Sequence, residues 1–424
     1  MAFEFERVEI APGARLHVSQ ERKWKTTLIV ARLSCSLAED PTRTALVPLV
    51  LARGTVRLRT PREVARHLEE LCDADFDVDT LRLGDAQVVE LRLEVAGSTY
   101  VGGRDTLGEG LDFLADVIFR PALDSSGCFA ESGLAIEKEN LRRAIEGLRD
   151  ERAEYAVERT ARLLGRGEPS ERYQLGDVAD LPSIGGADLA ARWRALIARA
   201  HIDLFVCGEC DAREVERAVR TRFPLASAAD RIPAPLPLTA PRPGPEVREM
   251  ECAALSQAHL CLGYRTGIGY LEKDYAPLAV LHALFGADAQ SRLFKRVREK
   301  EGLAYEAGAS FDQLKGTLTA HVGVDPRDVD RAEAIVGEEL ARLCEEAVPE
   351  PELEEARRYA FERLREADDD PLARAALEHA GALVGGEPVS HATLLDRLRA
   401  VTADEVREVA RRLRLDAVFL FAPR

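Results

Sequence analysis

The chain alternates between two hydrophobic patterns along its 424 residues. Segments in which apolar and polar residues alternate, such as 87–95 (QVVELRLEV) and 317–325 (TLTAHVGVD), predict half-buried strands. Segments in which apolar residues recur every three or four positions, such as 107–120 (LGEGLDFLADVIFR) and 327–343 (RDVDRAEAIVGEELARL), predict amphipathic helices. This mixture indicates an α+β fold in which antiparallel sheets carry helices packed on one face.

The predicted elements follow the same order twice. A strand, at 26–34 or 257–267, is followed by an apolar helix, at 42–54 or 274–286. Each copy closes with a charged helix and a final strand, and Gly-Glu-Pro stands before both closing helices, at 167–169 and 386–388. We therefore predict two homologous halves that arose by duplication of one α+β unit.

A proline-rich segment separates the two halves. Residues 231–247 (RIPAPLPLTAPRPGPEV) contain six prolines, which cannot continue a helix or a central strand. Such a segment is typical of an extended, semi-rigid linker. We predict an N-terminal half at 1–228, a linker at 229–248 and a C-terminal half at 249–424.

Composition and charge argue against several kinds of function. The 58 basic and 74 acidic residues give a formal net charge of −16, which disfavours sequence-independent binding to nucleic acids or anionic membranes. We find no signal peptide and no apolar run of about 18 residues that could span a bilayer. The eight cysteines are scattered, mostly within apolar patterns, so we expect reduced thiols and a cytoplasmic protein.

Two of these cysteines form a C-x-x-C motif, Cys207 and Cys210, where a predicted strand runs into a helix. Such a pair can be redox-active or half of a zinc site, but no second pair stands at a zinc-ribbon spacing. Packing at the end of the strand is the interpretation that we favour.

A helix that ends in a bend is predicted at 291–305 (SRLFKRVREKEGLAY). Leu293, Phe294 and Val297 form an apolar stripe, so Arg298 falls off that stripe towards solvent or a cavity. Gly302 can end the helix in a left-handed conformation, and Tyr305 then begins a strand. A guanidinium and a phenol at such a bend could hold a peptide carbonyl or stabilise an oxyanion.

The order of elements, the duplication and the linker resemble the pitrilysin/insulinase family of zinc peptidases, which includes the mitochondrial and bacterial processing peptidases. The resemblance extends over nearly the whole chain, and it is strongest at 291–305. This segment is similar to the family signature in which an arginine and a tyrosine lie seven residues apart, here Arg298 and Tyr305. The resemblance implies that both side chains act on substrate.

In that family the zinc centre lies on a first-half helix that reads H-x-x-E-H just before Gly-Thr. Two histidines four residues apart share one helix face to bind zinc, and the glutamate between them is the general base. Counted back from the Gly-Thr pair at 54–55, the five positions are Ala45, Leu46, Val47, Pro48 and Leu49. None of these side chains has a lone pair, so the segment resembles a zinc helix that has lost its chemistry.

A relocated metal site is not supported by the sequence. His67 and Glu70 have the right spacing, but Leu71 stands where the second histidine is required. The family's third ligand is a glutamate in a later helix, for which Glu146 is the nearest match, and we interpret it as an orphan carboxylate on a solvated face. The remaining histidines are isolated in sequence and are interpreted as structural: His17, His201, His259, His282, His321, His379 and His391. We predict no metal and no other cofactor in this chain.

Three functions are compatible with these observations. The first is a non-catalytic subunit of a heterodimeric processing-type zinc peptidase, in which Arg298 and Tyr305 act in trans on a peptide or unfolded protein. Zinc would then belong to a partner of the same family with an intact H-x-x-E-H. The sequence does not decide whether the chain forms a homodimer when that partner is absent. The second is a structural or peptide-binding protein, like the core proteins of respiratory complexes. The third, a self-sufficient enzyme, lacks a G-x-S-x-G elbow or a phosphate-binding loop to support it. The Arg/Tyr signature favours the first.

Overall fold

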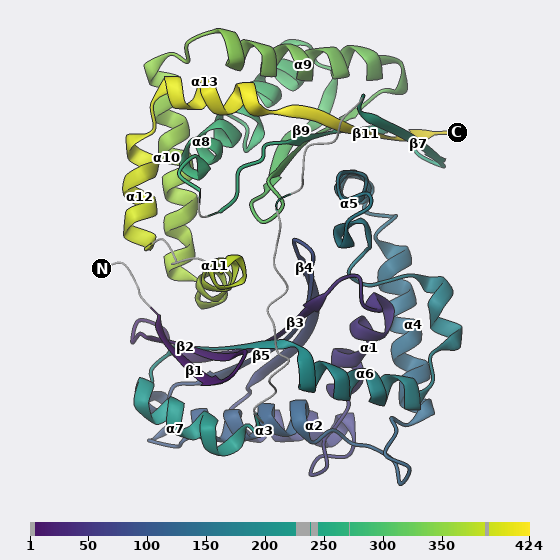
Figure 1. Cartoon of the computed structure of the whole chain (residues 1–424), viewed down its shortest axis with the longest axis vertical. Coiled ribbons are helices and arrows are strands. Elements are labelled where there is room, and N and C mark those ends of the chain that lie inside the picture. The colour runs from purple at the N-terminus through teal and green to yellow at the C-terminus, as the bar shows by residue number, and fades with distance from the viewer. Residues whose placement is uncertain (1–4, 226–237, 239–244, 271, 386–389) are drawn as a thin grey trace.

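The computed structural model of the chain describes residues 5–225, 238, 245–270, 272–385 and 390–424, and for Tyr305 it describes the backbone only. Two β-sheets, one from each half, lie on either side of helices α5 and α11, and most other helices cover the outer faces of the sheets (Figure 1). The α+β prediction with two halves is therefore confirmed.

The N-terminal sheet has six strands in the order β1-β2-β6-β3-β5-β4. Only β2 and β6 run parallel, and every other neighbouring pair is antiparallel. The strands are β1 (Glu6–Ala11), β2 (Ala14–Gln20), β3 (Thr26–Ser36), β4 (Asp75–Leu83), β5 (Ala86–Ala96) and β6 (His201–Gly208).

The C-terminal sheet repeats this arrangement without the outermost strand, in the order β7-β11-β8-β10-β9. Here too a single pair, β7 and β11, is parallel. Because the closing strand of each half inserts at the equivalent place, the two sheets have the same topology, as a duplication requires. The strands are β7 (Val247–Ala253), β8 (Ala258–Arg265), β9 (Ala304–Asp312), β10 (Thr317–Val324) and β11 (Arg414–Pro423).

Helices with local start signals cover the outer faces of the sheets. Thr60 and Glu63 form a capping box before α2, as Thr402 and Glu405 do before α13. In the N-terminal half these helices are α1 (Pro41–Leu51), α2 (Pro61–Glu70), α3 (Thr106–Phe119), α4 (Glu131–Gly147), α6 (Gly186–Arg199) and α7 (Ala212–Arg222). In the C-terminal half they are α8 (Tyr275–Gly286), α9 (Val329–Glu345), α10 (Glu350–Glu366), α12 (His391–Ala400) and α13 (Ala403–Arg412).

The two remaining helices are exchanged between the halves, which the sequence does not predict. Helix α5 (Arg152–Leu164) of the N-terminal half packs on the inner face of the C-terminal sheet, where Ala156 and Leu164 meet Phe419 and Phe421. Helix α11 (Pro371–Val384) of the C-terminal half packs on the inner face of the N-terminal sheet, where Ala375 meets Phe205. Each sheet is therefore covered on its second face by a helix from the other half (Figure 1).

The end of the predicted linker needs a correction. Val247 and Arg248 were expected to belong to the linker at 229–248, but they are the first two residues of β7, where they pair with β11. Val247 is not a proline, so it has a backbone N–H, and it follows the last proline by two residues. It can therefore join the edge of a sheet. Most of the linker and the second Gly-Glu-Pro, at 386–388, lie outside the described residues.

Candidate functional site

The segment that resembles the zinc helix is a helix of the hydrophobic core. Helix α1 starts at Pro41, and Ala45, Leu46 and Val47 are at most 1% exposed. Pro48 is also buried, and at the position of the general base it supplies neither a carboxylate nor a backbone N–H. The residues at these positions do not fit a zinc ion, because none of their five side chains carries a nitrogen, oxygen or sulfur atom.

The carboxylates on the neighbouring helix α4 are bound to cations or amides. Glu137 is buried and accepts hydrogen bonds from Arg53 Nη1 at 2.6 Å and from Asn140 Nδ2 at 2.9 Å. Glu146 is exposed and forms an ion pair with Arg142 one turn away, as expected for a carboxylate on a solvated face. Among the described residues, no group of three or more His, Cys, Asp or Glu side chains could hold a metal ion.

Several isolated histidines have the structural environments expected of them. His67 is half-buried against the ring of Phe113, with 5.5 Å between ring centroids, and Leu71 is fully buried. Burial lowers the pKa of His259, His282 and His321. His282 Nε2 lies 2.8 Å from the carbonyl oxygen of Ala309, to which it can donate a hydrogen bond.

Three other histidines come together although they are distant in sequence. His17, His201 and His379 all point a ring nitrogen at Asp203, with distances between 2.9 and 3.5 Å. Strands β2 and β6 of the N-terminal half supply two of them, and α11 of the C-terminal half supplies the third. The sequence carried no signal for this cluster, because it forms only when the exchanged helix docks.

The segment that carries Arg298 adopts the predicted bend. Residues Phe294–Lys300 form a π-helical turn, in which the N–H of Glu301 bonds to the carbonyl of Arg296, five residues earlier. Leu293 and Val297 are fully buried, and Arg298 is exposed with its guanidinium 4.9 Å from the centre of the Phe294 ring. Single π-helical turns are frequent at functional sites.

Gly302 ends this turn in the left-handed conformation that the sequence predicts. Its φ angle is +64°, and the N–H of Leu303 returns to the carbonyl of Val297 at 3.0 Å. Tyr305 is the second residue of β9, at the edge of the C-terminal sheet. Its side chain lies outside the described atoms, so the pairing of Arg298 with Tyr305 stays a prediction.

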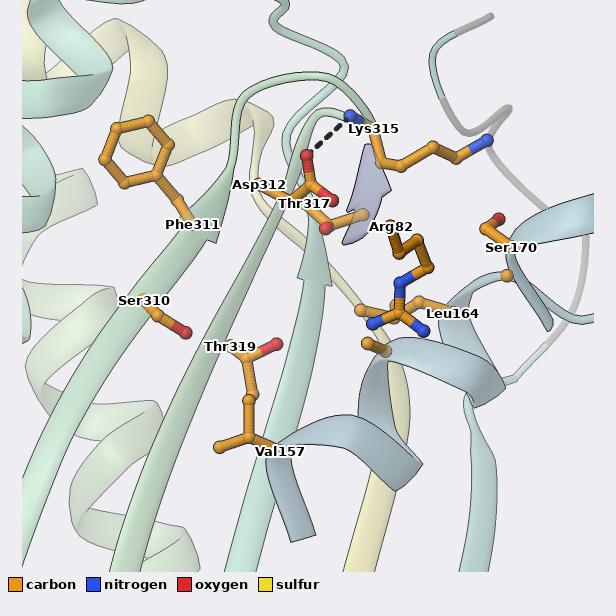
Figure 2. A pocket seen from close by; sticks show the side chains of 12 residues that line it. Arg82, Val157, Leu164, Ser170, Ser310, Phe311, Asp312, Lys315, Thr317 and Thr319 are labelled. Atoms are coloured by element: carbon orange, nitrogen blue, oxygen red, sulfur yellow. Dashed lines mark hydrogen bonds between the residues drawn. The ribbon is translucent and has the colours of Figure 1, made fainter. Parts of the chain in front are cut away.

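A cavity of about 170 Å³ lies between the halves, and no residue of 45–49 or 291–305 lines it. Figure 2 shows Ser310 and Thr319 on adjacent strands of the C-terminal sheet, with Val157 and Leu164 of α5 beside them. Two cations also line this cavity, but both are neutralised. Arg82 makes two hydrogen bonds to Glu158, at 2.6 and 2.7 Å, and Lys315 Nζ binds Asp85 and Glu168. The cavity therefore offers no unpaired cation to an anionic ligand.

The C-x-x-C motif lies at a strand end, as the packing interpretation expects. Cys207 is fully buried at the end of β6, and Cys210 is half-buried in the turn that follows. Burial raises the pKa of both thiols to about 12. Protonated thiols are poor nucleophiles and poor metal ligands.

Comparisons with known proteins are consistent with this geometry. Residues 183–359 match the family model described as the peptidase M16 inactive domain. A probable inactive metalloprotease of Bacillus subtilis (strain 168), YmfF, is 26% identical over 421 residues, which cover 96% of this chain and 95% of that protein. An uncharacterized zinc protease of Streptomyces coelicolor is 29% identical over 257 residues, which cover 57% of this chain and 53% of the relative.

Solved structures share the whole fold. A conserved protein from Enterococcus faecalis V583 has a TM-score of 0.91 and 26% sequence identity over 99% of both chains. A peptidase M16 inactive domain from Pseudomonas fluorescens has a TM-score of 0.80 over 99% of this chain and 98% of that one. At 19% identity, the second similarity shows the fold alone.

Fold and site together define a metallopeptidase-type protein of two homologous halves whose zinc helix carries no metal ligand. The chain is a homologue of M16-like metalloproteases described as inactive, which is the type of protein that the pitrilysin/insulinase resemblance predicts. The family resemblance seen in the sequence is thereby confirmed. None of the helices in the described part of the chain has the length and hydrophobicity needed to cross a bilayer.

Proposed function

We propose that this chain is the zinc-lacking subunit of a two-subunit peptidase, and that it supplies Arg298 and Tyr305 in trans to a catalytic partner. The observation that supports this most is a contrast between two segments. The positions of the zinc motif are filled by apolar side chains, all buried except the half-buried Leu49, whereas the 291–305 segment presents Arg298 at the surface. A chain without any catalytic connection has no need for that exposed signature.

The local geometry suits Arg298 for binding a peptide. Its guanidinium lies over the Phe294 ring, which restrains the side chain through a cation–π contact. Five N–H donors in a planar fork can bind a carbonyl or carboxylate oxygen of a substrate. Tyr305 is assigned by the family signature, and a phenol hydroxyl beside the guanidinium would stabilise an oxyanion that forms at the partner's zinc.

In this proposal the partner brings the metal. The zinc positions at 45–49 offer no ligand, and the buried carboxylate of Glu137 nearby is already neutralised by Arg53. We therefore expect a family member with an intact H-x-x-E-H motif as partner, and an extended peptide or unfolded protein as substrate. Each chain would lack what the other provides.

The test is peptide cleavage by the two chains, separately and mixed, with zinc measured in each. We expect this chain to contain no stoichiometric zinc and to be inert alone, but to raise the turnover of an H-x-x-E-H subunit from the same organism. Arg298→Ala should lower the partner-dependent kcat/KM by about 100-fold, the loss typical for removal of one oxyanion donor. Lys295→Ala, an equally exposed cation on the same segment, should leave it unchanged.

Other outcomes have distinct meanings. Stoichiometric zinc or unaided cleavage would contradict our interpretation of the 45–49 segment. If this chain never changes a partner's turnover, a structural or peptide-binding role replaces the proposed one. If Lys295→Ala is as harmful as Arg298→Ala, the segment docks the partner and Arg298 has no specific role towards substrate.

A further inference from the structure

A buried polar cluster that joins the two halves is centred on His17. Its imidazole is fully buried on β2, and it stacks on Phe205 of β6 with the ring centroids 4.6 Å apart. Nε2 lies 2.9 Å from Asp203 Oδ1, and Nδ1 lies 2.8 Å from Glu378 Oε1. Asp203 belongs to the N-terminal half and Glu378 to α11 of the C-terminal half, so the ring bridges the two halves.

Both ring nitrogens of His17 must donate, because both partners are carboxylates. An ionised carboxylate has only acceptor oxygens, and a neutral imidazole has a single N–H. The geometry therefore requires an imidazolium. Burial by itself would lower the pKa of His17, but the hydrogen bonds and charges of Asp203 and Glu378 outweigh it and raise that pKa above its ordinary value.

The carboxylates have further partners on the N-terminal side. Asp203 also accepts from Arg15 Nε at 3.0 Å, and Glu378 from Arg7 Nη2 at 2.7 Å. The remaining charged, titratable and polar groups around the ring come from several neighbouring elements. They are His201 on β6, Arg32 and Ser34 on β3, Glu90 on β5, bound to Arg32 at 2.7 Å, and His379 on α11.

The two neighbouring histidines do not substitute for His17. Burial lowers the pKa of His379 to about 4, so its ring is neutral near neutral pH. Its Nε2 lies 3.5 Å from Asp203, and its Nδ1 has no hydrogen-bond partner. Both nitrogens of His201 likewise lack a hydrogen bond of normal geometry. Of these three histidines, only His17 forms a hydrogen bond to each of the two carboxylates.

We propose that His17 is a proton-controlled latch that holds helix α11, and with it the C-terminal half, on the N-terminal sheet. Loss of its proton leaves one nitrogen lone pair facing a carboxylate oxygen inside the protein. Asp203 and His17 lie on neighbouring hydrogen-bonded strands, so the sheet fixes their distance. Glu378 on the exchanged helix is the partner that can move, so deprotonation loosens α11.

Other contacts between α11 and the N-terminal half remain when His17 loses its proton, so α11 is loosened but not released. Arg32 Nη1 donates to the carbonyl of Ala375 at 3.1 Å, and Arg7 keeps its ion pair with Glu378. The Arg7 side chain is 42% exposed, so water screens that pair. The latch therefore tunes how firmly two otherwise connected halves are held together.

The pH range of the effect follows from linkage. The pKa of His17 is raised in the folded protein. Its contribution to the stability of the docked α11 is therefore complete below about pH 6.5, the ordinary histidine pKa. The contribution is lost as the pH rises through the higher value of the folded state. The docked position of α11 should therefore weaken on the alkaline side.

The test is hydrogen–deuterium exchange of the full chain between about pH 6 and pH 9, a range that contains histidine titration. Protection factors for 371–384 should fall by up to about tenfold per pH unit once His17 loses its proton. His17→Gln has an amide NH₂ group that can donate to one carboxylate and a carbonyl oxygen that can only accept, and it cannot titrate, so its protection should be low and independent of pH. His67→Gln, on outer helix α2, should behave as wild type. Equal pH dependence in wild type and His17→Gln would overturn the proposal.

A second measurement decides the question if His17→Gln does not fold. Trp24 donates Nε1–H to the carbonyl of Asp369 at 3.1 Å, and the Arg374 guanidinium lies 4.7 Å from the centre of its ring, so it reports on the start of α11. The sequence has two tryptophans, and Trp193→Phe makes Trp24 the single emitter. Its emission should shift to the red as the pH rises through the same range. A constant spectrum in this background would also overturn the latch.

Discussion

Leu46 shows how the helix that carries the zinc motif in the resembled family serves here as a packing helix. Its neighbours in α1 are apolar, it is fully buried, and it belongs to the main core of the N-terminal half. Burial of this kind contributes to folding in proportion to the apolar area removed from water. The side chains at 45–49 have thus not merely lost a function, because they now stabilise the half that carries them.

This role predicts a large loss of stability from a small truncation. Leu46→Ala should lower the free energy of unfolding by about 2–5 kcal/mol, since it removes buried methyl groups and leaves a cavity. Glu146→Gln, on the exposed face of α4, should change it by no more than about 0.5 kcal/mol. Denaturant unfolding followed by circular dichroism measures both. Equal stability of Leu46→Ala and wild type would mean that α1 is not a core helix.

Residues whose role depends on neighbouring sequence could be predicted, and residues that meet through tertiary packing could not. The positions at 45–49 and the turn at Gly302 are local patterns, and the structure has them where the sequence places them. His17, His201 and His379 were interpreted as isolated, because no sequence spacing relates two strands to a helix of the other half. The bulk of the predicted linker and the Tyr305 side chain lie outside the described atoms, so those two predictions stay open.

At the scale of elements, the bend after the π-helical turn sets where β9 begins. Gly302 has a φ angle of +64°, a backbone conformation that residues with a Cβ adopt only at an energetic cost. The space around the position of an added Cβ is open. The bend therefore depends on backbone conformation and not on the absence of a clash. The same short segment joins Arg298 to the strand that carries Tyr305.

Two glycine substitutions should have opposite effects for this reason. Gly302→Ala should cost about 1–2 kcal/mol, the penalty for a left-handed residue. Gly337→Ala, in helix α9 with equally open surroundings, should stabilise by about 0.5–1 kcal/mol. Thermal unfolding of both variants distinguishes them. If the Gly302 variant gains stability as well, the left-handed turn does not persist in solution.

The whole molecule is joined at two places by exchanged helices and buried charges. One is the His17 cluster under α11, and the other lies beside α5. There Lys315, in the β9–β10 turn, binds Asp85 Oδ1 at 3.1 Å and Glu168 Oε2 at 2.7 Å, both in the N-terminal half. Asp85 stands in the equivalent turn between β4 and β5, so the two hairpins of the duplicated unit meet each other. Because each half also buries a helix of the other, we expect the chain to unfold in one cooperative transition.

Substitution of Lys315 should clearly weaken the contact between the two halves. Its side chain is 5% exposed, so Lys315→Met would leave the Asp85 carboxylate buried beside a thioether. Breaking one partner of a buried ion pair typically costs about 3–5 kcal/mol, because the remaining charge has lost both water and its counterion. Arg265 lies 3.9 Å from Glu168 and compensates the charge of that carboxylate, but not that of Asp85. The loss of stability should therefore fall near the lower end of this range. Calorimetry should show a lower transition temperature, or two transitions if the halves separate.

The matched control is an ion pair that water already screens. Arg66 and Glu70 form such a pair on α2, with side chains 78% and 61% exposed, and Arg66→Met should shift the transition only slightly. Adding Asp85→Asn to Lys315→Met should recover part of the loss, because the uncompensated charge is then gone. If Lys315→Met were as mild as Arg66→Met, the buried charges would contribute little. Apolar packing of α5 and α11 would then account for the union of the halves.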